Sequence, residues 1–462
     1  MSFTVDAIKG GIESLGGDIK VVSQDVREVR DMMALEKEPK DITNTTANLT
    51  EFGGQHKKCL EGTRVEVLQE IRAWAGAQEN PLPVYCIADV AGTGKSTIAL
   101  TMYEEWRKQG PTPLAFFFSQ GGASLRTATD FCFFLKEQIK ALEGGPELDE
   151  YWRKLEPSLT ILRSQDIEQQ WTKLVYEPLR LLPKSDVRVL LVDALDECTL
   201  ATRGDLLKCI LSACSSGSTP HIRVFITTRN EPDIRKLLLH DTYSKIIIQK
   251  TLRNAGNAKK DVAFYVDHRL DESGIFESAP EQRQLLIDRC DGLFIFAFLA
   301  CQLLEQSSEE GKPLEDILKE FTQLDVLYNQ TLSIAEKPAK YNRELLKNIL
   351  GVIVAALEPL SITAISTMLP DPVKISGVQT LIGRLGSIVG SGGVDEPVYI
   401  LHATFREFLL RQSWVTTTQL TMTNVYAISN SISNRNMARS CLNVLINELK
   451  SMVYLLYGAS RY

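Results

Sequence analysis

Residues 84–100 read Val84-Tyr85-Cys86-Ile87-Ala88-Asp89-Val90-Ala91-Gly92-Thr93-Gly94-Lys95-Ser96-Thr97-Ile98-Ala99-Leu100, and they set the architecture of this 462-residue chain. The first five residues have the composition of a buried strand, two glycines follow in a short loop, and Lys95-Ser96-Thr97 opens a helix. A strand, a glycine-bearing loop and a helix in this order present backbone N–H groups and a helix N-terminus to an anion. The residues therefore predict a phosphate-binding loop in preference to an ordinary glycine turn.

The residue types of this loop predict how a nucleotide and its metal ion are held. Gly92 and Gly94 let the backbone pass close to a phosphate, where a Cβ atom would intrude. Lys95 is expected to reach the β- and γ-phosphates, and the Ser96 hydroxyl to coordinate the accompanying Mg²⁺. The predicted nucleotide contacts in the loop are Ala91, Gly92, Thr93, Gly94, Lys95, Ser96 and Thr97.

One position departs from the P-loop pattern. Asp89 stands five residues before Gly94, where the pattern has glycine. A carboxylate close to phosphates is unfavourable, so Asp89 is expected to weaken nucleotide binding unless its side chain points away.

A second set of functional residues follows another apolar segment. Residues 188–193 form a predicted strand that ends in clustered acids. We expect Asp193 to hold Mg²⁺ beside the phosphate loop as a Walker-B residue, and Asp196 and Glu197 to orient or deprotonate the attacking water. Acids at the end of a strand are often only solvated, but three at this spacing after a phosphate loop favour a site.

The remaining strands complete the fold prediction. Residues 114–118 and 224–228 are further strand candidates, and the latter ends at Arg229. We expect Arg229 to sense or neutralise the γ-phosphate charge; the alternative is a surface arginine before the helix that Pro232 opens. Alternating strands and helices predict an α/β fold, a P-loop NTPase parallel sheet with helices on both faces and ligands at the carboxyl ends of its strands.

Composition excludes several classes of function. The net charge is -7 and no basic run occurs, which argues against nucleic-acid binding. The nine cysteines form no Cys-x-x-Cys pair, so neither a zinc site nor a disulfide framework is expected. The longest apolar run, residues 293–301, is far shorter than the ~20 residues of a membrane span. With no signal-peptide pattern at the N-terminus, a cytoplasmic protein is predicted.

The N-terminal segment, residues 1–38, carries its own periodicity. Apolar residues recur at alternating spacings of three and four from Val5 to Met33, the repeat of a left-handed coiled coil. Gly11, Gly16 and Gly17 weaken a helix by about 1 kcal/mol each, so a single helix docked on its own protein is the open alternative. If the helix self-associates, oligomerisation is its use. Residues 39–58 are polar and are predicted to be a linker.

Taken together, the motifs resemble the NACHT domain of STAND-class P-loop NTPases, the signalling ATPases that include NOD-like receptors. The similarity rests on Gly-Thr-Gly-Lys-Ser-Thr, Val-Asp-Ala-Leu-Asp-Glu and Thr-Thr-Arg in that order, and it covers roughly residues 55–412. The lead-in Gly62-Thr63-Arg64 and the segments 116–119 and 194–198 resemble the fungal branch in particular. Two residues differ from that pattern: Asp89, and Gln120, where fungal relatives often carry arginine.

This resemblance implies a domain order: a NACHT domain at 59–250, a helical domain at 251–335, a winged-helix domain at 336–412 and a helical tail at 413–462. In the family, a winged-helix histidine contacts the β-phosphate of ADP and holds the protein closed. His402 matches that position, although a lone histidine entering an apolar helix is also compatible with a structural role. Relatives continue into a repeat array that senses a ligand. None is found here, so we expect a truncated form or a sensor or effector partner.

The sequence therefore predicts a nucleotide-dependent signalling switch of the innate-immunity or non-self-recognition type. ADP would keep it closed, ATP would allow it to oligomerise, and slow hydrolysis would reset it. GTP is disfavoured because no Asn-Lys-x-Asp motif occurs. Two alternatives remain, a non-hydrolysing scaffold assembled through the N-terminal helix and a high-turnover P-loop ATPase.

Overall fold

The computed structural model describes most of the chain after residue 57, within the unit formed by residues 48–462. The helix predicted at residues 1–38 and nearly all of the predicted linker at 39–58 lie outside the described residues, as do Ser119 and Gln120. The described ranges are 58–77, 81–109, 113–118, 127–142, 145–182, 187–215, 222–253, 257–271, 275, 280–309, 314–336, 343–356, 358–371, 373–391, 393–415 and 419–459.

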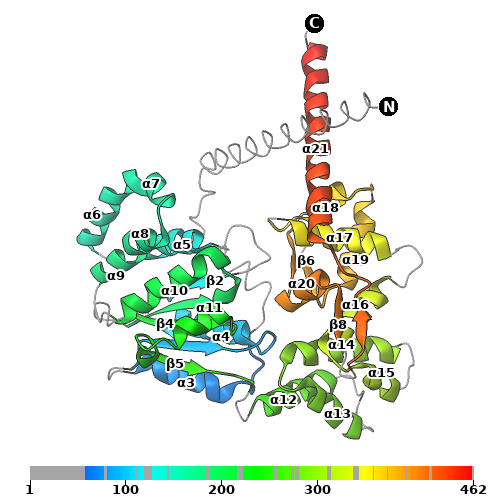
Figure 1. Ribbon diagram of the computed structural model, residues 1–462, viewed down its shortest axis with the longest axis horizontal. Coiled ribbons are helices and arrows are strands. Elements are labelled where there is room, and N and C mark those ends of the chain that lie inside the picture. The colour runs from blue at the N-terminus through cyan, green and yellow to red at the C-terminus, as the bar shows by residue number, and fades with distance from the viewer. Residues whose placement is uncertain are drawn as a thin grey trace, which may run out of the picture. The chain divides into compact units, whose positions relative to one another are not determined.

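A five-stranded parallel sheet forms the centre of the N-terminal half, in the order β2-β3-β4-β1-β5 (Figure 1). This confirms the predicted α/β fold. The sheet contains one strand that was not predicted from the sequence, β5, in which an exposed glutamine and a half-buried lysine interrupt the apolar pattern. The strands are β1 (Val84–Ala88), β2 (Leu114–Phe117), β3 (Arg188–Asp193), β4 (Ile222–Thr228) and β5 (Ile247–Lys250).

Helices cover both faces of the sheet because side chains alternate along each strand. Tyr85 and Phe225 point to one face, where they pack with residues of α3 and α4. Phe116 points to the other face, against Phe131 of α5 at a ring distance of 5.2 Å, and α10 lies beside α5 (Figure 1). The helices of this half are α3 (Val65–Gly76), α4 (Lys95–Gln109), α5 (Ala128–Lys140), α6 (Pro146–Leu155), α7 (Leu159–Arg163), α8 (Ile167–Trp171), α9 (Glu177–Leu181), α10 (Leu200–Ser215) and α11 (Pro232–Leu238).

Helices α6 to α9 form an insertion between α5 and β3 that the sequence analysis did not anticipate. Trp171 of α8 anchors it by stacking on Phe131 of α5, with ring centroids 6.3 Å apart. The insertion therefore extends the helical cover of one sheet face, and its described residues add no strand.

The C-terminal half is built on one continuous apolar core that extends from Val262 to Ile428. Two small antiparallel sheets accompany its helices, β6 (Val389–Ser391) with β7 (Val398–Ile400) and β8 (Ser413–Val415) with β9 (Thr421–Thr423). The helices are α12 (Ala258–Asp271), α13 (Pro280–Cys290), α14 (Phe294–Glu309), α15 (Leu314–Glu320), α16 (Leu324–Glu336), α17 (Arg343–Ala355), α18 (Ile362–Met368), α19 (Ile375–Arg384), α20 (Ala403–Leu410) and α21 (Asn430–Ala459).

Three local features of the C-terminal half concern where its elements begin and end. A break at Gly292, which has a φ of +77, separates α13 from α14. Strands β6 and β7 pair as an antiparallel hairpin, in which Gly390 and Ser391 belong to β6. Helix α21 begins at Asn430, directly after a segment that buried Tyr426 and Ile428 fix to the core. The domain boundaries at 250, 335 and 412 stay predictions.

No helix in the described part of the chain is both long and apolar enough to cross a membrane.

Candidate nucleotide-binding site

The carboxyl ends of the parallel strands bring the predicted site residues to one edge of the sheet. Asp89 follows β1, Asp193 ends β3 and Arg229 follows β4. In the sheet, β4 lies between β3 and β1, so Arg229 emerges between the phosphate loop and the Walker-B acid. Such an edge is where open α/β sheets bind ligands.

The phosphate loop has the backbone that its glycines predict. Gly92 and Gly94 adopt φ values of +81 and +86, which side chains with a Cβ disfavour. A Cβ on Gly92 would overlap Ile295 of α14, so glycine is required by packing as well as by backbone angle. The chain then enters α4 at Lys95 and leaves a helix N-terminus facing the loop, as an anion site requires.

Lys95 is buried inside this loop and is held by its backbone. Its Nζ donates to the carbonyl oxygens of Val90 and Asp89, at 2.8 and 3.0 Å. Burial lowers the pKa of Lys95, and the nearby Asp196 carboxylate opposes that change. The ammonium group is therefore in place to meet a phosphate that enters the loop.

Asp89 does not face the phosphate cradle. Its Oδ1 accepts from the Val90 backbone N–H at 2.7 Å. Its Oδ2 accepts from the backbone N–H groups of Leu252 and Arg253, at 2.5 and 2.7 Å, in the segment after β5. The carboxylate thus points away from the phosphates, the arrangement in which the sequence analysis expected it to be tolerated. Asp89 serves as a structural link between the phosphate loop and the start of the C-terminal half.

Asp193 is fully buried at the end of β3 and has one oxygen engaged. The Thr227 hydroxyl donates to Oδ1 at 2.5 Å and itself accepts from the Ala194 backbone N–H at 2.9 Å. Burial raises the pKa of Asp193 to about 6, and the hydroxyls of Thr227 and Ser96 oppose that shift. Its Oδ2 has no hydrogen-bond partner among the described residues. A buried, unsatisfied carboxylate oxygen beside a serine hydroxyl is a donor set that fits Mg²⁺.

Asp196 and Glu197 follow a backbone turn at Ala194, which has a left-handed φ of +52. The Arg229 backbone N–H donates to Asp196 Oδ1 at 2.9 Å, and Arg229 Nε lies 3.0 Å from Oδ2. Asp196 therefore orients Arg229. Asp196 and Glu197 both line the cavity described below, and their role towards an attacking water stays a prediction.

Arg229 connects the sheet to the C-terminal half. Its guanidinium forms a second ion pair, through Nη1, with Glu407 of α20. Although burial disfavours the charged form, the carboxylates of Glu407 and Asp196 raise the pKa of Arg229. A side chain predicted to sense phosphate is thus bound between two acids from different parts of the chain.

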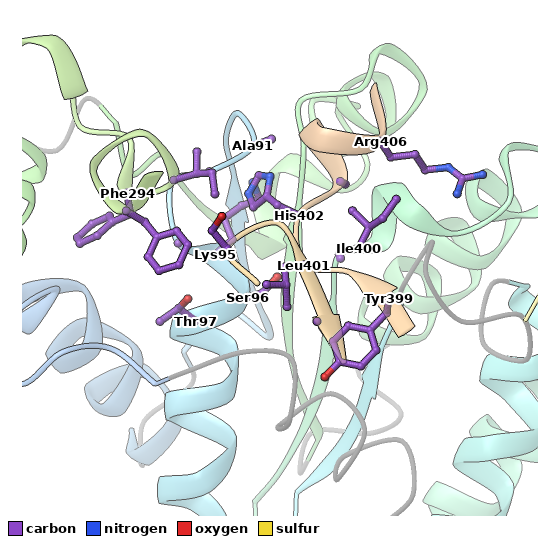
Figure 2. A pocket seen from close by; sticks show the side chains of 18 of the residues that line it. Ala91, Lys95, Ser96, Thr97, Phe294, Tyr399, Ile400, Leu401, His402 and Arg406 are labelled. Atoms are coloured by element: carbon purple, nitrogen blue, oxygen red, sulfur yellow. The ribbon is translucent and has the colours of Figure 1, made fainter. Parts of the chain in front are cut away.

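His402 lies at the N-terminus of α20 and reaches the phosphate loop. Its Cε1 is 3.8 Å from the position that a Cβ on Gly92 would occupy. Figure 2 shows the His402 ring close to Ala91 and Lys95, with Phe294 and Arg406 on opposite sides. The structure therefore brings the histidine predicted from family resemblance to the loop, about 310 residues away along the sequence from Gly92.

These residues surround a cavity of about 780 Å³, within the range of roughly 300–1,000 Å³ that is usual for small-molecule sites. Its walls come from three places: the segment before α3, the carboxyl edge of the sheet, and helices and strands of the C-terminal half. The predicted site residues that line it are Ala91, Gly92, Gly94, Lys95, Ser96, Thr97, Asp196, Glu197, Arg229 and His402.

The site role of Arg64 was not predicted from the sequence, where Arg64 stands out only as part of a family-like segment. Arg64 is 4% exposed, its Nη2 donates to the Thr93 carbonyl at 2.8 Å, and its guanidinium carbon lies 5.0 Å from the centre of the Phe294 ring. Asp261 lies 3.6 Å from Nη1, and Nε has no hydrogen-bond partner among the described residues. Aromatic residues near this end of the cavity, Phe294, Tyr265 and Phe298, were also missed, because their spacing is that of an ordinary core helix.

The segment that holds the phosphate loop and the Walker-B acid matches a known family. Residues 62–229 match the family described as Nephrocystin 3, N-terminal. The vegetative incompatibility protein HET-E-1 of Podospora anserina is 25% identical over 343 residues, which are 69% of this chain and 24% of that protein. The chain thus spans about a quarter of the length of this curated relative.

Among solved structures, similarity extends to an Aeropyrum pernix ORC1 protein in complex with DNA (13% identity, TM-score 0.35, 75% of this chain and 91% of that chain). A Cdc6p from Pyrobaculum aerophilum matches with 12% identity, a TM-score of 0.38, and coverage of 78% and 96% respectively. An AMPPCP-bound DnaA from Aquifex aeolicus matches with 13% identity, a TM-score of 0.31, and coverage of 73% and 91%.

Proposed function

We propose that this chain, a NACHT-type P-loop NTPase, is a switch in which a bound adenine nucleotide joins the phosphate loop to α20 through His402. The observation that carries the proposal is the single cavity lined by the loop, by Arg229 and by His402. A ligand that contacts both halves of the chain stabilises the closed arrangement, in which both halves can contact it at once. ADP is the proposed ligand of the closed form.

The described residues supply each part of a nucleotide site. The glycine loop and the N-terminus of α4 would hold the phosphates, and Lys95 would neutralise their charge. Ser96 and Asp193 would hold Mg²⁺, which supplies charge compensation at the phosphates when it is bound. Arg64 and the ring of Phe294 offer a cationic and an aromatic surface at the end of the cavity where a base would lie.

In the closed form, the position of Arg229 would keep hydrolysis slow. A transition-state charge is stabilised best by a cation aimed at it, and here the guanidinium is bound to Asp196 and Glu407. In the closed form, Arg229 is thus paired with Glu407 of α20. We propose that exchange of ADP for ATP, with its additional phosphate, competes with Glu407 for Arg229 and releases α20. The opened chain then oligomerises.

Signalling of a non-self-recognition type is the proposed biological setting, in keeping with the vegetative incompatibility protein that shares this segment. The sensed ligand would be bound by a sensor or effector partner or by a further part of the protein. High-turnover ATPase activity is the less favoured candidate, because Arg229 is engaged elsewhere.

The proposal is tested by calorimetric titration of Mg-ATP and Mg-ADP into the purified chain. Lys95→Ala should weaken both nucleotides by at least about 10-fold, since a buried charge-assisted contact contributes about 1.5–3 kcal/mol. Lys108→Ala is the matched control, an exposed lysine at the other end of α4, and should bind as the wild type does. Unchanged affinity in Lys95→Ala would remove the basis of the proposal.

Assembly gives a second test. His402→Leu should populate larger assemblies in light scattering after size exclusion with ATP, because the closed form loses its contact to ADP. His240→Leu, an exposed histidine far along the chain from α20, is the control. An unchanged mass distribution for His402→Leu with ATP present counts against the switch.

A further inference from the structure

The His402 ring is held by a short hydrogen-bonded chain that begins in the core. Thr404 Oγ1 lies 2.5 Å from His402 Nδ1, and the Thr404 backbone N–H donates to the same nitrogen at 3.3 Å. On its other side, Thr404 Oγ1 lies 2.7 Å from the hydroxyl of Tyr328 in α16. Three residues from two helices and a cap thus form one continuous network.

The directions of these hydrogen bonds can be assigned. A backbone N–H only donates, so Nδ1 of His402 is the unprotonated, accepting nitrogen. The Thr404 hydroxyl, which also faces Nδ1, therefore donates its single proton to it. The oxygen of Thr404 then accepts from the Tyr328 hydroxyl. With Nδ1 occupied as an acceptor, the proton of the neutral ring resides on Nε2.

The far end of the network is rigid. Tyr328 is 1% exposed and packs against Phe405 and Phe408 of α20, with ring centroids 5.1 and 5.5 Å apart. A buried tyrosine hydroxyl needs a hydrogen-bond partner, and Thr404 provides it. The core therefore fixes the Thr404 hydroxyl, and the hydroxyl fixes the ring.

We propose that Thr404 and Tyr328 are positioning residues that lock His402 in the Nε2–H tautomer. Phosphate oxygens only accept hydrogen bonds, so the locked ring offers them a donor. The opposite tautomer would turn a lone pair towards them. The ring edge at Cε1, which joins the two nitrogens, lies over Gly92 of the phosphate loop. This inference rests on the proposed function for its consequence, but the tautomer itself is a property of the nucleotide-free chain.

The tautomer is measured directly by nitrogen NMR of the full chain labelled with ¹⁵N-histidine and free of nucleotide. The chain has five histidines, and the His402→Leu spectrum identifies the signals of His402. We expect Nδ1 to resonate as an unprotonated nitrogen and Nε2 as a protonated one. Thr404→Val removes the hydroxyl while keeping the side-chain shape. It should move both signals part of the way towards the average of the two tautomers, because the backbone N–H of residue 404 still donates to Nδ1. Thr404→Ser should restore the wild-type pattern, and Tyr328→Phe should produce an intermediate shift.

A wild-type spectrum with the proton on Nδ1, or spectra that do not change in Thr404→Val and Tyr328→Phe, would overturn the lock. Thermal unfolding of each variant shows whether it is folded. If Thr404→Val is unfolded, the spectra of Thr404→Ser and Tyr328→Phe test the lock in its place.

ADP titration then separates the lock from the proposed function. Thr404→Val should weaken ADP about 3- to 10-fold, and Thr404→Ser should bind as the wild type does. If His402→Leu weakens ADP but Thr404→Val does not, the positioning role is wrong and the proposed function stands. If the spectra behave as expected and His402→Leu binds ADP as tightly as the wild type, the lock stands and the proposed function is wrong.

Discussion

At the scale of single residues, Asp89 shows how a departure from a motif can be accommodated. The P-loop pattern alone makes this acid unfavourable, yet its side chain is turned out of the cradle and accepts three backbone N–H groups. Two of these belong to the segment after β5, which lies about 160 residues further along the sequence. The Asp89 carboxylate therefore holds that segment in place and does not face the phosphate site.

Asp89→Gly, which restores the usual pattern, should therefore destabilise the chain and leave nucleotide affinity no better. Buried donors that lose their acceptor cost about 1–3 kcal/mol each, so a loss of about 2–4 kcal/mol in the free energy of unfolding is expected in urea denaturation. Asp89→Ala should lose nearly as much, because glycine flexibility adds only about 0.5–1 kcal/mol. Tighter ATP binding by a fully stable Asp89→Gly protein would refute this account.

Asp193 predicts a pH dependence of stability for the protein without metal or nucleotide. Burial raises the pKa of Asp193 to about 6, above the value near 3.9 that is usual for the unfolded chain. Between these values the folded chain binds the proton more tightly, so the contribution of Asp193 to stability falls as pH rises from about 4 to about 6 and then levels off.

Asp193→Asn has no charge to bury, so the variant should gain stability relative to the wild type over that same window. Urea unfolding of both proteins at pH 5, 6 and 7.5 measures the difference in their free energies of unfolding. Titrating groups that the two proteins share cancel in this difference. A difference that is constant with pH, or one that favours the wild type as pH rises, would contradict the assignment.

At the scale of elements, α20 is the part of the C-terminal half that meets the site. It brings His402 at its N-terminus and Glu407 one turn further on, and these contact the phosphate loop and Arg229 respectively. Its inner face is fixed to the core through Phe405 and Phe408. A movement of α20 away from the sheet would therefore break both contacts together.

Glu407→Gln should weaken the link to Arg229 with little cost to stability, because exposed ion pairs contribute only about 0–1 kcal/mol. We expect it to lower the ATP concentration at which larger assemblies form, as measured by mass photometry. Asp325→Asn is the matched control, since its partner Arg411 lies in the same half of the chain and the pair does not reach the sheet. Equal assembly by both variants would show that the Arg229–Glu407 pair does not restrain opening.

Elements also show what the sequence could predict. In residues 84–100, the apolar run predicts β1, the two glycines predict the loop, and Lys95 marks the start of α4. The acid cluster at the end of β3 likewise predicts site residues. Helices α6 to α9 and strand β5 were not predicted, because their apolar residues are scattered among charged ones and no motif marks them. Arg64 and Glu407 could not be assigned to the site, since a charged residue has no sequence pattern that reveals its partner across the fold.

At the scale of the whole molecule, the site is assembled from segments that begin at Lys58 and end at Arg406. Such a site exists only when the N-terminal and C-terminal halves are together, so a ligand that fills it favours that arrangement by its differential affinity. The central claim is that His402 makes this difference for ADP.

The release of fluorescent ADP and ATP analogues from wild-type and His402→Leu protein tests that claim most directly, measured by stopped flow with excess unlabelled nucleotide. The loss of one hydrogen bond to a charged phosphate corresponds to about 1.5–3 kcal/mol. ADP should therefore leave His402→Leu at least about 10-fold faster, while ATP release changes by less than about 2-fold. Equal acceleration of both nucleotides, or no acceleration of ADP, would contradict the account.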